Sequence, residues 1–527
     1  MSTSTRVRTI RAFLEHAVSE VPDEPYLIWN DEVVTYATFD AEVNRASRIW
    51  LDLGISRGDR VAMMAGNSPE FLYSWLGLAK IGATLVAINT GFKSIEVAYI
   101  LQHSGARIAL VDPEFADIVR DARASTPTLE SIYSIGPCRD LQDFEAFRRE
   151  ADPGAPDTHP NEDDIASFIY TSGTTGKPKA VMHSQRNFVL TGESYPSWMG
   201  MEHGDRIYAC LPLFHINSQA YSTMGAIGAR GAMVLVPRFS ASRFWSDIKK
   251  HRVAVFNFIG AMTLILSKKQ PEPDDTDHVV KVAYGVPALP GELRDELEAR
   301  YGMRIVSGFG MSETTFGLLE PFDERRRPGA MGFPRHHPDP QIARTEAKIV
   351  DESGAEVPDG TPGELVLRGP ATMLGYFNDP EKTDEALRGD WLHTGDMAFR
   401  DTDGQFFFLD RKKDIVRRRG ENVSSLEVED TISDHPAVLE CAVVGVPSDF
   451  TDEDLMVYVV PRAGYELAFD ELAAWTEQRL ARFKVPRYYA RIDALPKTPT
   501  QKVEKHRLRS LAESHVVEYD NEPAGRR

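Results

Sequence analysis

Short apolar runs alternate with amphipathic segments through the first 112 residues of the chain. Three apolar runs have the length of strands, at residues 60–64, 83–88 and 107–111. Three segments repeat their apolar side chains at helical spacing, at residues 36–53, 67–81 and 94–103. Ser68 and Pro69 suit the start of the second helix. Alternation of this kind predicts parallel sheets covered by helices, so we expect an α/β fold that serves here as scaffold.

The alternation continues past residue 300, after which strands dominate and a mixed segment follows. Further strands are predicted at 164–170, 180–182, 232–236 and 254–259 and near residues 281 and 305. A strand that runs into a polar turn is predicted at 209–217, and a helix at 240–251. Asp403-Gly404 between two apolar runs predicts a hairpin turn. Helices at 426–432 and 469–480 with strands at 438–446, 454–460 and 488–492 predict a small α+β domain. The polar residues after 512 predict a frayed tail.

Composition narrows the class of protein without revealing its chemistry. A chain of 527 residues is too long for one core, so at least two domains are expected. The net charge of −19 argues against nonspecific nucleic-acid binding and against an anionic membrane surface as partner. The three cysteines are far apart, and His336-His337 lies in a Pro-rich turn, which predicts a surface loop and no metal site. Without an apolar signal core or an apolar run of about 18 residues, we expect a cytoplasmic protein with no membrane insertion.

The densest group of anion-binding side chains is Tyr170–Lys179 (YTSGTTGKPK). Its glycines allow backbone N–H groups to turn toward an anion, and its hydroxyls and lysines add donors and positive charge. It is not a Walker A loop, because Gly173 and Gly176 enclose only two residues and Pro178 follows Lys177. A polar hairpin tip is the alternative interpretation, but the number of donors favours a polyphosphate-binding loop.

Four further stretches follow this loop, and the five in order identify a resemblance. They are Ser307–Thr314 (SGFGMSET), Trp391–Asp396 (WLHTGD), Asp410–Val423 (DRKKDIVRRRGENV) and Leu495–Lys505 (LPKTPTQKVEK). The set resembles the adenylate-forming superfamily, and most of all its acyl-CoA synthetase branch with the carnitine/crotonobetaine-CoA ligase relatives. The chain departs from the usual motifs at Ala180, Phe309 and Gln501, where the superfamily has glycine, tyrosine and glycine.

The resemblance implies a role for each matching residue. It implies an ATP site whose residues contact the phosphates, the ribose or the adenine. These residues are Thr171, Ser172, Gly173, Thr174, Thr175, Gly176, Lys177, Lys179, Gly285, Phe309, Gly310, Met311, Ser312, Asp396 and Arg411. Phe309 would stack on adenine, since stacking needs only the ring face. Glu313 would hold Mg²⁺, a cation that prefers oxygen ligands. Lys502 would be the catalytic lysine, Lys413 the hinge, and Gly420 part of the CoA tunnel.

The resemblance does not identify the acid that supplies the acyl group. The residues expected to line its pocket are His215, Asn217, Tyr221, Ala261, Tyr284 and Gly317, with His215 beside the carboxylate. A histidine with satisfied hydrogen bonds in the core is the plain alternative for His215, and the Leu-Pro-Leu-Phe-His context favours the site. Tyr284 is either a core tyrosine or a residue that shortens the pocket for a short or aromatic acid.

The resemblance implies a two-step reaction in which ATP adenylates a small carboxylic acid and CoA then takes the acyl group. Alternatives are a carrier protein, an amine or oxygen as the acceptor, nitrite in place of the acid, or a noncatalytic nucleotide sensor. The implied fold has a large domain at 1–412 with two doubly wound αβ sheets and a distorted β-barrel, and a small mobile α+β domain at 413–512, followed by a polar tail at 513–527. Homodimer formation is left open.

Overall fold

The computed structural model describes residues 7–171, 178–286, 288–289, 291–412, 414–418, 421–448, 453–465, 467–497, 502–512 and 518–521. These residues form two compact units. The first contains the described residues up to Thr171 together with Pro178–Ala347 and Leu367–Leu392, and the second contains Lys348–Val366 and the described residues from His393 onward. Among the described residues, no helix combines the length and the apolar character needed to cross a bilayer.

The first unit begins with a mostly parallel sheet of the order β7-β6-β5-β3-β4-β8-β9. Its strands are Gln142–Asp143 (β7), Ser131–Ser134 (β6), Ile108–Val111 (β5), Arg60–Met64 (β3), Thr84–Ala87 (β4), Ile165–Thr171 (β8) and Lys179–Ser184 (β9). All neighbours pair in parallel except β8 and β9, which are antiparallel. The antiparallel β9 therefore returns the chain beside β8 after the predicted phosphate loop.

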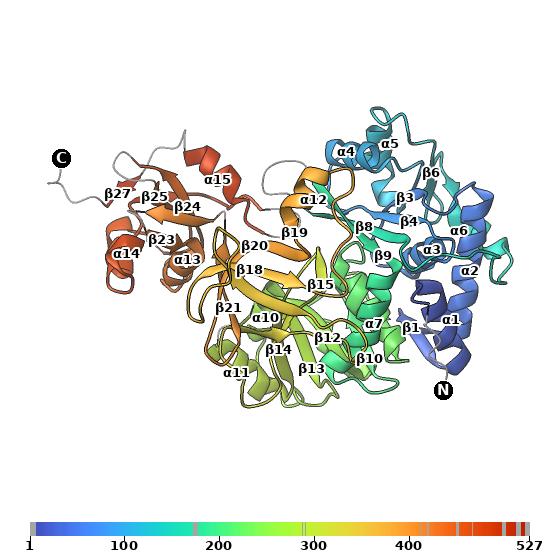
Figure 1. Ribbon diagram of the computed structural model, residues 1–527, viewed down its shortest axis with the longest axis horizontal. Helices are drawn as coiled ribbons and strands as arrows, with labels where there is room; N and C mark the ends of the chain where they lie inside the picture. Colours follow the sequence, from blue (N-terminus) through green and yellow to red (C-terminus); the bar gives the residue numbers. More distant parts are fainter. Residues whose placement is uncertain are drawn as a thin grey trace. The chain divides into compact units, whose positions relative to one another are not determined.

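Helices cover both faces of this sheet, as the sequence predicts. Val61 and Met63 of β3 belong to the core cluster of α2 (Tyr36–Asp52) and α3 (Pro69–Lys80), whereas Ala62 and Met64 belong to that of α4 (Ser94–Ser104) and α5 (Ala116–Arg123). Figure 1 shows α4 and α5 on the opposite side of these strands from α2 and α3. Alternate strand residues thus bury toward opposite helix layers, which is the arrangement expected for a doubly wound sheet. Ser68 caps α3 by accepting from the Phe71 N–H.

The second sheet of this unit has the order β16-β15-β14-β13-β12-β10-β11-β1-β2. Its strands are Ala330–Pro334, Thr314–Leu319, Arg304–Met311, Val282–Val286, Val253–Ile259, Arg206–Ala209, Ala232–Leu235, Pro25–Trp29 and Glu32–Thr35 in that order. One face packs on α7 (Gln185–Met199) and α8 (Met224–Gly228), and the other on α9 (Phe244–Lys250) and α11 (Gly291–Tyr301). Pairing changes from parallel to antiparallel at β14, where the Gly-rich stretch lies.

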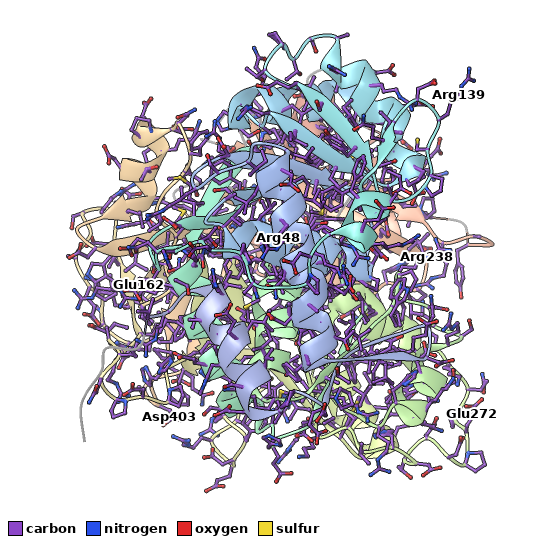
Figure 2. The ribbon with its side chains drawn as sticks, turned by 90° about the vertical axis from the view of Figure 1, so that its right-hand side faces the viewer. Arg48, Arg139, Glu162, Arg238, Glu272 and Asp403 are labelled. Carbon is purple, nitrogen blue, oxygen red and sulfur yellow. The ribbon has the colours of Figure 1, made fainter. Side chains whose placement is uncertain are left out.

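Smaller elements complete the first unit. The described part of the second unit contains strands, which are followed by an α+β segment. The remaining helices and the short strand of the first unit are α1 (Ile10–Glu20), η1 (Pro113–Phe115), α6 (Phe144–Glu150), α10 (Gly260–Ser267), α12 (Pro380–Ala386) and β19 (Leu387–Arg388). The strands β17 (Glu346–Val350), β18 (Gly363–Arg368), β20 (Trp391–Arg400) and β21 (Phe406–Arg411) are neighbours in one sheet. Asp403 and Gly404 form the predicted turn between β20 and β21, and Figure 2 labels Asp403.

The rest of the second unit is the α+β segment. Its elements are β22 (Ile415–Arg418), β23 (Glu421–Ser424), α13 (Ser425–Ser433), β24 (Val438–Pro447), β25 (Glu453–Pro461), α14 (Phe469–Glu477), η3 (Arg482–Lys484), β26 (Tyr488–Arg491), α15 (Lys505–Ala512) and β27 (Tyr519–Asp520). The strands β24, β25, β26 and β27 form one sheet, while β22 and β23 form a separate antiparallel pair. Helices and strands alternate here much as the sequence predicts.

The α/β fold class is confirmed, and several local predictions need correction. In the stretch 209–217, predicted as a strand that runs into a polar turn, the strand already ends at Ala209, and the predicted helix at 240–251 begins only at Phe244. The frayed tail was wrong for Tyr519–Asp520, because these residues pair with β26. The surface loop at the two histidines was wrong for His337, whose buried imidazole lies 3.1 Å from Glu193. The boundary at residue 412, the barrel and the mobility of the small domain stay predictions.

Candidate active site

The predicted phosphate loop is held between two paired strands. Thr171 at the end of β8 pairs with Lys179 at the start of β9, and the Pro178 carbonyl accepts a hydrogen bond of 3.2 Å from the Tyr99 hydroxyl. The residues between these ends, which are Ser172, Gly173, Thr174, Thr175, Gly176 and Lys177, lie outside the described part of the chain. Their roles stay predictions, while their two anchor points are fixed by the sheet.

A lysine, a tyrosine and a carboxylate lie in a row where the loop rejoins the sheet. The Lys179 Nζ atom lies 4.5 Å from the centroid of the Tyr376 ring. The Tyr376 hydroxyl donates a hydrogen bond of 2.8 Å to Glu313 Oε1, and Glu313 is 8% exposed. Burial raises the pKa of Tyr376 well above its ordinary value, so this hydroxyl stays a donor. The structure therefore brings the last residue of the phosphate loop close to the predicted Mg²⁺ ligand, through a tyrosine for which no role was predicted.

A buried histidine forms a hydrogen bond to the turn that carries Ser312 and Glu313. His183 Nε2 lies 2.6 Å from the Ser312 carbonyl oxygen, and its Nδ1 lies 3.2 Å from the Asn187 side-chain nitrogen. An amide nitrogen can only donate, so Nδ1 accepts and Nε2 carries the proton that is donated to Ser312. Thr191 of α7 forms a similar 2.6 Å bond to Thr315 at the start of β15. Sequence reasoning missed His183, which looks like an ordinary residue within a short strand.

The neutral state of His183 predicts an acid-dependent loss of stability. Burial lowers the pKa of His183 from 6.5 to about 4. Below pH 6.5 the unfolded chain gains a proton that the folded chain does not bind, so stability is complete above pH 6.5 and falls toward pH 4. The His183 contribution to this loss should be about 2 kcal/mol between pH 7.5 and pH 5. Urea unfolding of the wild type and of His183→Gln at both pH values checks this, because the variant lacks the titrating group. A stability difference between the two proteins that stays constant with pH would contradict it.

Glycines allow the strands of the predicted adenine site to approach closely. A Cβ on Gly317 would lie 1.9 Å from the Phe309 carbonyl oxygen, and a Cβ on Gly308 would lie 2.4 Å from the Leu318 carbonyl oxygen. At Gly285 the added atom would meet the Phe258 ring at 2.5 Å, so a neighbouring strand already requires glycine there. The Phe309 ring itself is buried at 8% exposure. Gly310 and Met311 continue β14 to the turn at Ser312.

The predicted acyl-binding residues come from several elements of the first unit. Asn217 and Tyr221 lie on a π-helical segment, Asn217–Thr223, and such segments are frequent at functional sites. His215 lies just before it, with its ring centroid 4.6 Å from that of Phe214. The Asn217 Oδ1 atom is buried without a hydrogen-bond partner among the described residues, which leaves an acceptor for a ligand. Ala261 is the second residue of the helix α10, and its side chain is not among the described side chains.

In the second unit, the residues predicted to bind ribose face each other across a hairpin. Asp396 of β20 is opposite Arg411 of β21, and Arg411 Nε lies 2.8 Å from Asp396 Oδ1. Asp396 is 1% exposed. Glu364 Oε1 accepts from the Gly395 N–H at 3.1 Å, and Glu364 Oε2 lies 3.0 Å from Lys412 Nζ. Glu364, for which the sequence predicted no role, therefore holds the strand backbone just before Asp396.

Lys502 lies next to two backbone contacts in the same unit. Lys497 and Val503 form an antiparallel bridge, and the Glu504 N–H donates to the Pro496 carbonyl at 2.8 Å. These bonds lie directly beside Lys502, whose side chain is exposed. The predicted hinge Lys413 and tunnel residue Gly420 lie outside the described residues, so their roles stay predictions.

Comparison with known proteins gives matches over almost the whole chain. The model of the AMP-binding enzyme family matches residues 14–377, and that of the AMP-binding enzyme C-terminal domain matches residues 427–502. Crotonobetaine/carnitine–CoA ligase of Citrobacter koseri is 34% identical over 490 residues, which is 90% of this chain and 93% of the relative. The enzyme of the same name from Proteus mirabilis is also 34% identical, over 90% of this chain and 92% of its own length.

Solved structures give the same result at the level of the fold. The anthranilate CoA ligase AuaEII in complex with anthranoyl-AMP has a TM-score of 0.86 and 28% identity, covering 98% of this chain and 99% of that one. ATP-bound MatB from Rhodopseudomonas palustris has a TM-score of 0.85 and 25% identity, covering 95% of this chain and 98% of that one.

Proposed function

The chain belongs to the AMP-binding enzyme family and is an AMP-forming acyl-CoA ligase, and from this premise we propose which of its residues perform each step. Its substrates are a small carboxylic acid, ATP and CoA, and Mg²⁺ is the metal that this family uses. In the first step a carboxylate oxygen bonds to the α-phosphorus of ATP, and the bond to pyrophosphate breaks. In the second step the CoA sulfur bonds to the acyl carbon, and AMP leaves.

We assign the first step to the Lys179–Tyr376–Glu313 row and to Lys502. Two anions must meet in this step, so positive charge and hydrogen-bond donors are the main requirement. The residues from Thr171 to Lys179 would hold the outer phosphates, and the Ser312 hydroxyl would donate to the α-phosphate. The buried carboxylate of Glu313 fits a hard cation, and Mg²⁺ bound there would neutralise phosphate charge. The observation that carries this assignment is the Tyr376 bond to Glu313 beside Lys179.

The remaining assignments follow the same logic. Phe309 offers a ring face to adenine, while Asp396 and Arg411 would bind the ribose. His215 would lie beside the carboxylate, and Asn217, Tyr221, Tyr284 and Gly317 would contact the rest of the acid. We propose that rotation about Lys413 exchanges Lys502 for Gly420 between the two steps, because pyrophosphate and thiol chemistry require different surroundings.

The identity of the acid is a separate proposal. Carnitine, named for the curated relatives, carries a permanent positive charge on a quaternary ammonium group, and anthranilate, named for a solved relative, is aromatic. We propose that this chain activates another short acid. The accompanying proposals are a cytoplasmic location, where ATP and CoA are supplied, and a homodimer, which light scattering on the purified protein would detect.

Product analysis tests the proposed function. The purified protein is incubated with ATP, Mg²⁺, CoA and a panel of short, aromatic and charged carboxylic acids. We expect AMP and pyrophosphate in equal amounts, with one CoA consumed for each AMP. ADP as the nucleotide product would contradict the proposal, and AMP release that does not require CoA would point to another acceptor.

A further inference from the structure

A buried arginine lies among the residues that are proposed to contact the acid. Arg335 follows β16 and is 2% exposed. Three aromatic rings surround its guanidinium carbon, with centroids 5.3 Å away for Trp198, 5.5 Å for Tyr221 and 4.7 Å for Tyr284. Ring faces stabilise a cation but do not neutralise it.

The Arg335 guanidinium has more donors than the described protein provides acceptors. A guanidinium has five N–H groups. Its Nε donates to the Leu318 carbonyl at 2.9 Å, one terminal nitrogen donates to the Tyr221 hydroxyl at 3.3 Å, and the other donates to the Tyr284 hydroxyl. Two N–H groups therefore remain without an acceptor among the described residues. The Tyr284 hydroxyl accepts from Arg335, and its own proton also has no acceptor there.

No carboxylate of the described residues pairs with Arg335, in contrast to other buried arginines. Arg294 lies 3.3 Å from Glu320, and Arg418 lies 2.9 Å from Asp454. A buried charge without a counter-ion is costly, so proteins seldom keep one that serves packing alone. The missing negative charge is therefore best supplied by a ligand.

The position of Arg335 connects it to the site of adenylation. Its backbone N–H donates to the Gly317 carbonyl at 2.9 Å, and its guanidinium would lie 2.9 Å from a Cβ on Gly308. The Tyr221 hydroxyl would lie 3.4 Å from a Cβ on Gly310, two residues before Ser312. Arg335 therefore lies in direct contact with the Gly-rich strand. A ligand that reaches both Arg335 and the end of this strand must be short.

We propose that Arg335 and the Tyr284 hydroxyl bind a second, distal carboxylate of the substrate, so that the enzyme activates a small dicarboxylic acid. This inference rests on the proposed function, since it concerns the same acid. The guanidinium offers N–H donors to a planar acceptor, which suits a carboxylate in particular. The same geometry disfavours acids that carry a quaternary ammonium group, because the ring faces that would receive it are occupied by the Arg335 cation.

Matched pairs of acids test this proposal on the wild-type enzyme. Malonate, succinate and glutarate are each compared with their own monomethyl ester. Carnitine is added as an acid that carries a quaternary ammonium group. AMP formation is measured with ATP, Mg²⁺ and CoA. At least one dicarboxylate should exceed its ester about 30-fold in kcat/KM, because a charge-assisted hydrogen bond is lost in the ester. Equal rates for each acid and its ester, or a preference for carnitine, would overturn the proposal.

Variants separate recognition from folding. Arg335→Met should reduce kcat/KM for the dicarboxylate about 30-fold and leave that for the ester nearly unchanged, whereas Arg335→Lys should restore part of the preference. Tyr284→Phe keeps the ring, removes one donor and should cost about fivefold on the dicarboxylate alone. Arg238→Met is the matched control, because it removes an equal charge from an exposed position, labelled in Figure 2, and should not change the preference.

The outcomes also separate this inference from the proposed function. If no acid gives AMP, the proposed function itself fails. If acids are adenylated but Arg335→Met slows the dicarboxylate and its ester equally, only the inference fails, and Arg335 has a structural role.

Discussion

Replacing Lys502 with alanine is expected to reduce acyl-adenylate formation about 10²–10³-fold and to leave thioester formation from supplied acyl-AMP nearly unchanged. The lysine charge is required where a carboxylate approaches the α-phosphate, since the two groups repel each other. It is not required once pyrophosphate has left. ATP–pyrophosphate exchange measures the first step, and conversion of synthetic acyl-AMP with CoA measures the second.

The exposed position of Lys502 makes this test clean, because alanine there should not disturb the core. Lys484→Ala is a suitable control: it also removes a lysine from the second unit, where Lys484 pairs with Glu427 at 2.6 Å. The control should retain both activities. Equal losses of both half-reactions in Lys502→Ala would show that the lysine serves both steps and would refute the proposed exchange of Lys502 for Gly420.

Replacing Glu313 with glutamine should reduce ATP–pyrophosphate exchange about 10²-fold or more, with partial recovery at high Mg²⁺ concentration. Glutamine keeps the size of the side chain and an oxygen for the Tyr376 hydroxyl, but it lacks the negative charge that a hard cation prefers. Exchange rates measured across a Mg²⁺ titration, together with calorimetry of Mg²⁺–ATP binding, test this.

The comparison with Tyr376→Phe shows whether the charge or the hydrogen bond matters. That variant keeps the Glu313 carboxylate and removes only its 2.8 Å donor, so a loss of about tenfold is expected, with the Mg²⁺ dependence little changed. If Glu313→Gln had the same Mg²⁺ dependence as the wild type, Glu313 would not be the metal ligand.

Local signals in the sequence predicted most of the scaffold. Ser68 and Ser184 precede helices and both accept from backbone N–H groups of the first turn, as N-caps should. The strands β3, β4 and β5 have short apolar runs of the length typical of buried strands. Such features depend on a few consecutive residues, which is why they can be read without a structure.

The supporting residues of the site could not be predicted in the same way. His183, Tyr376 and Arg335 act through partners that are 129, 63 and 51 residues away in sequence, at Ser312, Glu313 and Tyr284 respectively. Arg335 follows a strand and precedes a Pro-rich turn, where an arginine is usually solvated. A Cβ on Gly308 would lie 2.9 Å from its guanidinium, so a distant glycine leaves room for the buried side chain, and no pattern within a short window reports that.

The π-helical segment at Asn217–Thr223 has a consequence for how recognition of the acid could change in this chain. A π-helix contains about one residue more per turn than the α-helix it interrupts. Deleting one of the three residues between Asn217 and Tyr221 would return the segment to ordinary helical winding and leave these two side chains three positions apart in place of four. If these residues contact the acid as we propose, the fit of the acid depends partly on chain length, so a one-codon deletion could reshape recognition while every side chain around Arg335 keeps its identity.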